Sequence, residues 1–532
     1  MKKGFIAVLT ILLMLTACVS LSSCIGDDVE GGVIYSGVWA IGCEDDVTEV
    51  TLRDGTAGIK SGAFSGRSDI TKITIPDSVR TVMNGAFTGC DGIITTQDGV
   101  RYVDGWVIDA SETVSTVKIK EGTRGIADEA FYDCRELGSI EVPNSVFSIG
   151  TRAFYGCNSI VSISLPFIGQ QRDGTLNNHF GYIFGASDPD ENAEKVPHTL
   201  ETVTVTGDTA ISAKAFTGCK SIKTLKFEGE IENIGEYAFS ECTSLTEFTA
   251  NGSYKTIGRY AFFRCRALKR ITLPEGLTDI GNYAFAICRS LEAIEAPNTL
   301  KTIGEGAFVQ CDNATTLTLP EGLEHIGQQA FDTCNALTSV NVPDCDMGKM
   351  AFYKCEGLTA VTLSEGRRSI PEGAFEGCTA LHSVKMPKSL TEICESAFYG
   401  CSSLESVNLE EGLVKIEKSA FSQCFSLNSI SLPESLTELG EQAFYGTACA
   451  KKGKDGVSVV DGWIVGASAS IIKLTLAEDI IGIANNAFAE CYGLTDVYYA
   501  GDAAAFGRIK LGEENDPFCE AEIHYGNDEK TD

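Results

Sequence analysis

The residue types that carry most catalytic and metal chemistry are present in this chain, but they are not spaced for it. The chain has 5 histidines among 532 residues, and none falls in a HExxH or comparable metal-binding arrangement. No Gly-rich phosphate loop and no Gly-x-Ser-x-Gly nucleophile turn occurs. Carboxylates are abundant, yet no pair carries a glycosidase motif. We therefore expect no catalytic residue, no cofactor and no metal centre.

One acidic cluster needs separate consideration because carboxylates ligate calcium. It comprises Asp188, Asp190, Glu191 and Glu194. Its spacing lacks the glycine and the terminal acid of an EF-hand loop. We expect a solvated acidic loop here rather than a calcium site.

Most of the 21 cysteines share one position of a repeated pattern, which makes them a set rather than a pair. No zinc-type pairing of cysteines or histidines accompanies them. One cysteine per repeat unit at a constant position predicts a buried ladder of free thiols, in which cysteine acts as a small apolar residue. A disulfide among the cysteines outside this position stays open. The structural ladder is expected at Cys219, Cys242, Cys265, Cys288, Cys311, Cys334, Cys355, Cys378, Cys401 and Cys424, with further members at Cys90, Cys134, Cys157 and Cys491; the cysteines outside it are Cys43, Cys345, Cys394, Cys449 and Cys519.

The elements that position these cysteines follow from an Ala-Phe dipeptide that recurs about every 23 residues. A fixed period of this size is typical of a solenoid, in which each unit contacts only its neighbours. A solenoid offers long surfaces and seldom a catalytic cleft. The repeat phenylalanines are Phe64, Phe87, Phe131, Phe154, Phe216, Phe239, Phe262, Phe285, Phe308, Phe331, Phe352, Phe375, Phe398, Phe421, Phe444 and Phe488.

Within one unit the apolar spacing changes. From Ile280 to Leu291 the apolar residues are three and four apart, which favours one or two helical turns. Patterns such as Leu268-x-x-Ile271-x-Leu273 and Leu427-x-x-Ile430-x-Leu432 then favour a short strand. We expect coils of a short parallel strand plus a helical or irregular return. The glycines that follow the next isoleucine (150, 235, 258, 281, 304, 327 and 440) are expected to supply turns with positive φ.

The unit Leu277 to Pro297 resembles the BspA-type leucine-rich repeat, and the resemblance extends over about residues 47–526. It implies an α/β repeat solenoid, a right-handed leucine-rich repeat superhelix with a parallel sheet along one face. It also implies a bacterial surface protein that binds host proteins or other cells. We expect the solenoid at 47–494, a closing segment at 495–526 like that of the family, and a tail at 527–532.

The N-terminus predicts export and lipidation. A basic start precedes an apolar run that is too short for a retained membrane span. We expect a lipoprotein signal peptide at 1–23 with lipidation of Cys24, whose acidic flank resembles the tether of surface-exported lipoproteins. Cys18 and ordinary secretion without lipid are the alternatives. Residues 24–46 are expected to form a tether and a degenerate N-terminal coil.

Three segments depart from the period. Two double-length units, 88–131 and 445–488, share an Asp-Gly-Trp insert, and each is expected to add a coil. Their Trp106 and Trp463 are expected in core or turn packing, with a ligand platform as the alternative. The 167–200 insertion is expected to be a long coil packed by Phe180, Tyr182 and Phe184, and a binding site is the alternative.

The strand positions that point away from the core predict a surface rich in Ser, Thr and Asn. We call these residues the candidate binding face: Arg270, Thr272, Thr316, Thr318, Ser339, Asn341, Ser406, Asn408, Ser429 and Ser431. The formal net charge of −31 excludes nucleic acid and a basic membrane-docking surface, so the membrane is expected to be reached through the lipid only.

We therefore expect a non-enzymatic, monomeric surface lipoprotein of the outer membrane that acts in adhesion or protein recognition. A glycan- or nutrient-capturing lipoprotein and a periplasm-facing scaffold are the rival interpretations.

Overall fold

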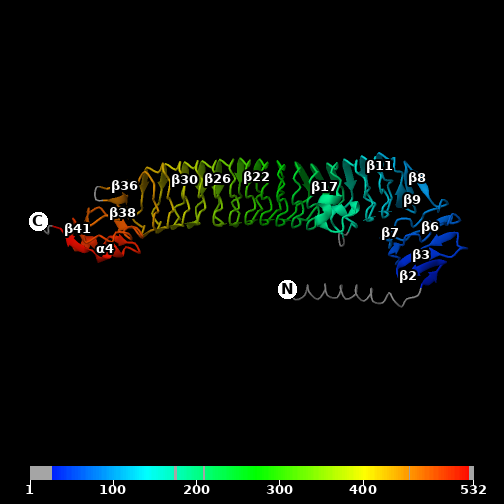
Figure 1. Cartoon of the computed structure of the whole chain (residues 1–532), viewed down its shortest axis with the longest axis horizontal. Helices are drawn as coiled ribbons and strands as arrows, with labels where there is room; N and C mark the ends of the chain where they lie inside the picture. The colour runs from blue at the N-terminus through cyan, green and yellow to red at the C-terminus, as the bar shows by residue number, and fades with distance from the viewer. Residues whose placement is uncertain (1–26, 173–176, 208–209, 454–455, 527–532) are drawn as a thin grey trace. The chain divides into compact units, whose positions relative to one another are not determined.

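A computed structural model describes residues 27–172, 177–207, 210–453 and 456–526. The chain divides into two compact units, residues 1–231 and 232–532, and each is considered by itself. In both units, successive coils stack through two parallel ladders (Figure 1). One ladder is made of strands of three or more residues, here called face strands. The other is made of two-residue strands, here called short strands.

The face strands alternate exposed and buried residues, as expected for a sheet with one side on a core. In unit 1 they are β4 (Glu49–Thr51), β6 (Lys72–Thr74), β11 (Thr116–Lys118), β13 (Ser139–Glu141), β15 (Ser162–Leu165), β16 (Thr202–Val205) and β17 (Thr224–Glu230). In unit 2 they are β19 (Glu247–Asn251), β22 (Ala293–Glu295), β24 (Thr316–Thr318), β26 (Ser339–Val342), β28 (Ala360–Leu363), β30 (Ser383–Lys385), β32 (Ser406–Asn408), β34 (Ser429–Ser431), β39 (Lys473–Leu476), β41 (Asp496–Tyr499) and β43 (Glu522–Tyr525).

The short strands form the second ladder, with an isoleucine or its equivalent buried in every coil except that of β42, where Leu511 is exposed. In unit 1 they are β5 (Gly58–Ile59), β7 (Thr81–Val82), β12 (Gly125–Ile126) and β14 (Ser148–Ile149). In unit 2 they are β18 (Asn233–Ile234), β20 (Thr256–Ile257), β21 (Asp279–Ile280), β23 (Thr302–Ile303), β25 (His325–Ile326), β27 (Asp346–Met347), β29 (Ser369–Ile370), β31 (Glu392–Ile393), β33 (Lys415–Ile416), β35 (Glu438–Leu439), β40 (Gly482–Ile483) and β42 (Lys510–Leu511).

Of the two expected forms of the return, helical or irregular, the structure shows the irregular one. Between Ile280 and Leu291 the chain makes consecutive turns and no helix. Tyr283 and Ile287 have φ of 56° and 64°, and such left-handed residues interrupt a right-handed helix. The three-and-four spacing therefore comes from tight turns that bring every third or fourth side chain back to the core.

The positive φ expected for the glycines that follow the short-strand isoleucine is wrong. Gly281 does not have a positive φ, and neither do Gly304 and Gly327. A Cβ added to Gly281 would lie 2.9 Å from the carbonyl carbon of Gly258 in the preceding coil. At Gly304 the corresponding distance to the backbone of Gly281 is 2.7 Å. Glycine suits this position because a Cβ would contact the backbone of the preceding coil, although Pro371, Cys394 and Glu417 hold the equivalent position in three other coils.

The core of unit 2 contains a stack of the repeat phenylalanines that runs from Phe239 to Phe444. The rings of Phe285 and Phe308 are 5.1 Å apart at 4°, and those of Phe308 and Phe331 are 5.5 Å apart at 1°. These side chains are at most 1% exposed. The backbone follows the same spacing, since Phe285 N–H donates to the carbonyl of Ala307 in the next coil at 2.7 Å. Each coil thus supplies both the apolar cover and the backbone partners of its neighbour.

The two double-length units contain antiparallel meanders rather than extra coils. One consists of β8 (Thr95–Gln97), β9 (Val100–Val103) and β10 (Trp106–Ala110), and the other of β36 (Lys451–Lys452), β37 (Val457–Val460) and β38 (Trp463–Ala467). A third meander, β1 (Asp28–Glu30), β2 (Val33–Ser36) and β3 (Trp39–Cys43), replaces the degenerate coil expected at the N-terminus. Asp-Gly turns with positive φ at both residues reverse the chain at 104–105 and 461–462, which accounts for the hairpins.

Each meander rejoins the ladder in the same way. Its last strand pairs in parallel with a short strand that begins with glycine: β3 with β5, β10 with β12 and β38 with β40. The tryptophan ring covers that glycine, and a Cβ on Gly125 would lie 2.4 Å from Trp106. Trp106 and Trp463 are 1% and 2% exposed, so the packing prediction is confirmed and a ligand platform on these rings is excluded.

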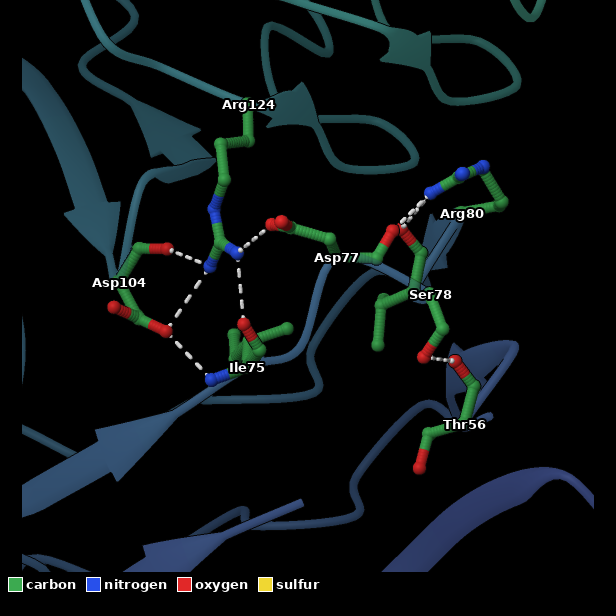
Figure 2. Close-up of polar contacts among 8 residues, drawn as sticks. Thr56, Ile75, Asp77, Ser78, Arg80, Asp104 and Arg124 are labelled. Atoms are coloured by element: carbon green, nitrogen blue, oxygen red, sulfur yellow. Dashed lines mark hydrogen bonds and ion pairs between the residues drawn. The ribbon is translucent and has the colours of Figure 1, made fainter. Parts of the chain in front are cut away.

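Polar contacts fasten the meander of β8, β9 and β10 to the coil before it (Figure 2). The Asp104 carboxylate accepts a hydrogen bond from Ile75 N–H at 2.5 Å and one from the Arg124 guanidinium at 3.0 Å. Arg124 also donates to the carbonyls of Ile75 and Asp104 at 2.8 and 2.7 Å and contacts the Asp77 carboxylate at 3.0 Å. The side-chain carboxylate of Asp104 therefore accepts from Ile75 N–H in place of the backbone carbonyl that an ordinary neighbouring coil would supply.

The meander of β36, β37 and β38 repeats this device, because the Asp461 carboxylate accepts from Leu432 N–H at 2.7 Å. A hydroxyl contact also recurs between coils. In Figure 2 the Ser78 hydroxyl donates to the carbonyl of Thr56 at 2.9 Å, and Ser435 does the same to Leu413 at 2.8 Å. Both serines lie two residues after a proline that ends a face strand. The serine hydroxyl therefore joins the turn after the proline to the preceding coil, although proline itself has no N–H to donate.

The 167–200 insertion is packed into unit 1 by its aromatic residues. It contains η1 (Phe180–Phe184), η2 (Pro189–Glu191) and α2 (Asn192–Lys195). Phe180 stacks on the repeat ring of Phe216 at 4.8 Å, while Phe184 contacts the ring of Phe154 at 6.2 Å. The expected packing by Phe180 and Phe184 is confirmed. Through these two rings, η1 connects the repeat phenylalanines Phe154 and Phe216.

The closing segment of unit 2 adds a final pair of strands and two short helices, α3 (Ala503–Phe506) and α4 (Asp516–Glu520). Strand β43 extends the face ladder in parallel with β41. Phe518 stacks on Phe488, the last repeat phenylalanine, at 5.0 Å. Across the described residues, no helix is long and apolar enough to cross a membrane.

The close approach of coils predicts a position-specific effect of glycine substitution. Gly281→Ala should destabilise the protein by about 1–3 kcal/mol, because the added methyl meets backbone rather than a movable side chain. Gly322→Ala is the matched control, since its nearest atoms are the Lys301 ammonium at 3.6 Å and a carbonyl at 3.9 Å. Urea unfolding of both variants measures the difference, and equal midpoints would contradict the close-approach explanation.

Candidate binding face

The candidate binding face lies on the solvent side of the face strands of unit 2. All ten of its residues are exposed. Eight belong to regular strands, where buried residues such as Leu317 and Val407 alternate with them toward the core. In Figure 1, β22, β26 and β30 follow one another along one side of this unit. The scaffold therefore presents these side chains in one stripe.

Parallel register aligns the stripe across coils. Ser406 and Asn408 lie beside Ser429 and Ser431, and Thr316 and Thr318 lie beside Ala293 and Glu295. Short hydroxyl and amide side chains dominate, so the surface can donate and accept hydrogen bonds along its length. Its charge is low compared with that of the whole chain, which reduces the desolvation cost of covering it.

The strand expected at Leu268–Leu273 is not present. Only one bridge, between Arg270 and Glu247, pairs this segment with β19. Tyr254, which occupies the core position that Leu277 has one coil later, is 1% exposed and donates its hydroxyl to the carbonyl of Thr272 at 3.1 Å. That carbonyl belongs to the strand position that elsewhere accepts a ladder N–H, as Thr318 does from Ala296. Because tyrosine is larger than leucine, the Tyr254 hydroxyl reaches the Thr272 carbonyl and uses the acceptor that a strand N–H has in other coils.

This interruption leaves a hollow of about 420 Å³ in the face of unit 2. Glu247, Lys269, Arg270 and Glu292 give it charged walls, and Phe248 contributes an apolar surface. The Arg270 guanidinium is 3.2 Å from the Glu292 carboxylate, and its side chain is 86% exposed. Arg270 and Thr272 therefore belong to a charged depression, whereas the other members of the candidate binding face lie on flat strands.

The cysteine ladder lies behind this face, in the core. Cys265, Cys288 and Cys311 are fully buried, and each thiol donates to the carbonyl of a repeat phenylalanine in the preceding coil. The Sγ–O distances are 3.1 Å to Phe239, 3.2 Å to Phe262 and 3.4 Å to Phe285. The same contact occurs at Cys334, Cys355, Cys378, Cys401 and Cys424. Cys219 and Cys242 are also buried.

Hydrogen-bond donation by the thiol explains the choice of residue at this position better than apolar filling alone. Thr447 holds this position in one coil and donates its hydroxyl to the carbonyl of Phe444 at 2.8 Å, and Arg67 holds it in another and donates to the carbonyl of Glu44 at 2.7 Å. The position therefore favours a hydrogen-bond donor. Burial raises the pKa of the Cys157 thiol to about 12 and that of Cys288 well above its usual range, so both stay protonated.

The remaining cysteines lie outside the ladder. Cys43, Cys345, Cys394, Cys449 and Cys519 are free thiols in the structure, and Cys519 alone among the described cysteines is exposed. Cys24 and Cys18, the predicted lipidation sites, lie outside the described residues. Lipidation therefore stays a prediction.

Two groups of metal-ligating side chains converge in unit 2, and each already contains a protein cation. Glu392, Cys394 and Glu417 surround the Lys415 ammonium, which is 2.9 Å from Glu417. The Glu417 carboxylate hydrogen-bonds Lys415 and raises the pKa of that lysine above its usual range. Both carboxylates of this group are therefore paired with a protein cation.

The second group is Asp496, Glu522 and His524. Hydrogen bonds from Thr495 and His524 lower the pKa of Asp496, and the Lys473 ammonium is 3.6 Å away. This carboxylate is thus satisfied by protein donors.

The acidic loop of the insertion shows the same satisfaction by the protein. The Asp188 carboxylate accepts from Asp190 N–H at 2.8 Å, and Asp190 pairs with Lys214 at 2.8 Å. Glu191 accepts from the N–H of Ser187, and Glu194 pairs with a neighbouring lysine at 2.7 Å. The carboxylates are directed to separate partners rather than to one common point.

Comparison with known families and structures identifies the repeat. The model of the BspA type leucine rich repeat region matches residues 42–161, 209–338 and 345–454, more than half of the chain. A leucine-rich repeat protein from Bacteroides ovatus is 20% identical, with 94% of this chain and 98% of that chain covered and a TM-score of 0.37.

Two further solved structures are similar. A leucine rich cell surface protein from Faecalibacterium prausnitzii is 17% identical, with 91% and 98% covered and a TM-score of 0.26. The pneumococcal vaccine antigen PcpA is 15% identical, with 94% and 96% covered and a TM-score of 0.24. No curated protein matches the chain.

Buried, protonated thiols predict a sharp division in cysteine reactivity. At pH 8, a thiol reagent such as DTNB should label Cys519 rapidly and the ladder cysteines only after unfolding, because the thiolate is the nucleophile. Above pH of about 8.5 the unfolded chain loses thiol protons that the folded chain retains, so stability should fall as the pH rises. Cys519→Ser should remove the rapid phase, and fast labelling of native Cys288 would contradict the buried ladder.

Proposed function

The chain belongs to the BspA-type leucine-rich repeat family, and on this premise we propose that it is a non-enzymatic surface protein that recognises a protein partner. The candidate binding face is the proposed contact surface. Through this face the protein is proposed to mediate adhesion to host cells or to neighbouring bacteria. A lipid on Cys24, with Cys18 as the alternative, is the proposed anchor to the outer membrane.

One observation carries this proposal: a run of neighbouring coils presents exposed Ser, Thr and Asn side chains on strands whose alternate residues are locked in the core. Rigid strands lose little conformational entropy when they are covered, so many weak contacts can add up to useful affinity. Short polar side chains also avoid the penalty of burying unpaired charge.

Charge placed on the face should remove binding. A variant with Thr316, Thr318, Ser339 and Asn341 all changed to lysine should bind host epithelial cells or neighbouring bacteria at least about tenfold more weakly, since buried unpaired charges oppose association. Flow cytometry with the labelled protein measures this effect. The matched control changes four exposed turn residues, Asn298, Asn313, Thr379 and Ser426, to lysine and adds the same charge away from the strands.

The comparison of the two variants decides the matter. Loss of binding in the face variant alone supports recognition through the candidate binding face. Equal binding by the face variant and the unsubstituted protein would contradict it, and loss in both variants would assign the effect to net charge.

A further inference from the structure

A second hollow lies in unit 1, where the insertion meets the turns that follow the repeat phenylalanines. It measures about 460 Å³, within the usual size range of small-molecule sites. One wall comes from the ordinary coils and contains Tyr132 and Tyr155. The opposite wall comes from the insertion and contains Phe184 and Lys195. The hollow therefore exists only because the insertion rises beside the repeat.

Two exposed aromatic rings form its first wall. Tyr132 and Tyr155 directly follow the repeat phenylalanines Phe131 and Phe154, and they are 44% and 38% exposed. Their rings stack with centroids 5.3 Å apart at 16°. The Arg152 guanidinium lies 5.7 Å from the Tyr155 ring, so that ring also has a cation as a neighbour.

The hollow also contains unused hydrogen-bonding groups. Among the described residues, the two tyrosine hydroxyls and the Asn158 side-chain amide make no hydrogen bond, although all three residues line the hollow. These groups supply both donors and acceptors. A ligand with several hydroxyl groups would satisfy them together.

The charges of the hollow cancel locally, unlike those of the chain as a whole. Asp133 pairs with Arg135 at 3.1 Å, and Glu194 pairs with Lys195 at 2.7 Å. Two cations therefore balance two anions in a protein with a net charge of −31. This balance disfavours phosphate, sulfate and polycationic ligands, and it leaves polar, planar side chains that hydrogen-bond a neutral ligand.

From these observations we propose that the hollow binds a neutral oligosaccharide. Tyr132 offers a ring face to the apolar C–H face of a sugar, and the hydroxyls of Tyr132 and Tyr155 and the amide of Asn158 hydrogen-bond its hydroxyl groups. Arg135 and Glu194 border the ligand without adding net charge, because each is paired with an opposite charge, Asp133 and Lys195 respectively. This glycan site is separate from the candidate binding face and goes beyond the proposed protein recognition.

A glycan array probed with the full-length protein tests this site. The array should include neutral oligosaccharides such as cellotriose, maltotriose, mannotriose and lacto-N-tetraose beside sialylated and sulfated glycans. At least one neutral glycan should bind, and calorimetry should then give its affinity. Tyr132→Ala and Asn158→Ala should each weaken binding at least about tenfold, the factor that corresponds to ~1.4 kcal/mol. Tyr132→Phe retains the ring stack and should lose less.

The matched control is Tyr445→Ala. Tyr445 also directly follows a repeat phenylalanine and is 64% exposed, but it belongs to unit 2 and does not line the hollow. Its substitution should leave glycan binding unchanged. Thermal unfolding of each variant separates loss of the site from loss of the fold.

Three outcomes would overturn the glycan site: no neutral glycan binds, anionic glycans bind more tightly than their neutral counterparts, or Tyr445→Ala weakens binding as much as Tyr132→Ala. None of them depends on the candidate binding face, which the lysine variants test on cells. Failure of one proposal can therefore be distinguished from failure of the other.

Discussion

Contact between the backbones of successive coils is the interaction on which the rest of the structure depends. Gly281 and its equivalents allow this approach, because a Cβ there would overlap the preceding coil. The approach brings Phe285 N–H to a carbonyl of the next coil and the Cys288 thiol to a carbonyl of the preceding one. The stacked phenylalanines fill the interior at the same spacing. Each coil is stable only between neighbours, as expected of a solenoid.

The same constraint explains where the chain can depart from its repeat. A meander is tolerated because its last strand pairs with a glycine-headed short strand and its tryptophan covers that glycine. The insertion is tolerated because Phe180 and Phe184 continue the ring stack. Variation therefore appears only where backbone pairing and core contacts are restored, and the new surfaces form beside a rigid scaffold. The hollow at Tyr132 and Tyr155 is one such surface.

Much of the fold could be predicted from the sequence, because a strict period fixes which residues share a face. The face strands and the buried cysteines follow from it. For the return, the sequence predicts a helical or irregular form, because spacing alone cannot distinguish a helix from consecutive turns with left-handed residues such as Tyr283. The meanders had a usable signal, since Asp-Gly between two strand-forming runs favours a hairpin. Neither hollow could be predicted, because each depends on contacts such as that of Tyr254 with Thr272.

Protease treatment of intact cells tests the central functional claim, display outside the cell, most directly. The account predicts that the protein is degraded on intact cells, and that Cys24→Ala releases it from the membrane whereas Cys18→Ala does not. Protection of the protein until the outer membrane is opened would contradict surface recognition and favour a periplasm-facing scaffold. Release by Cys18→Ala alone would move the anchor to that residue and leave the display claim intact.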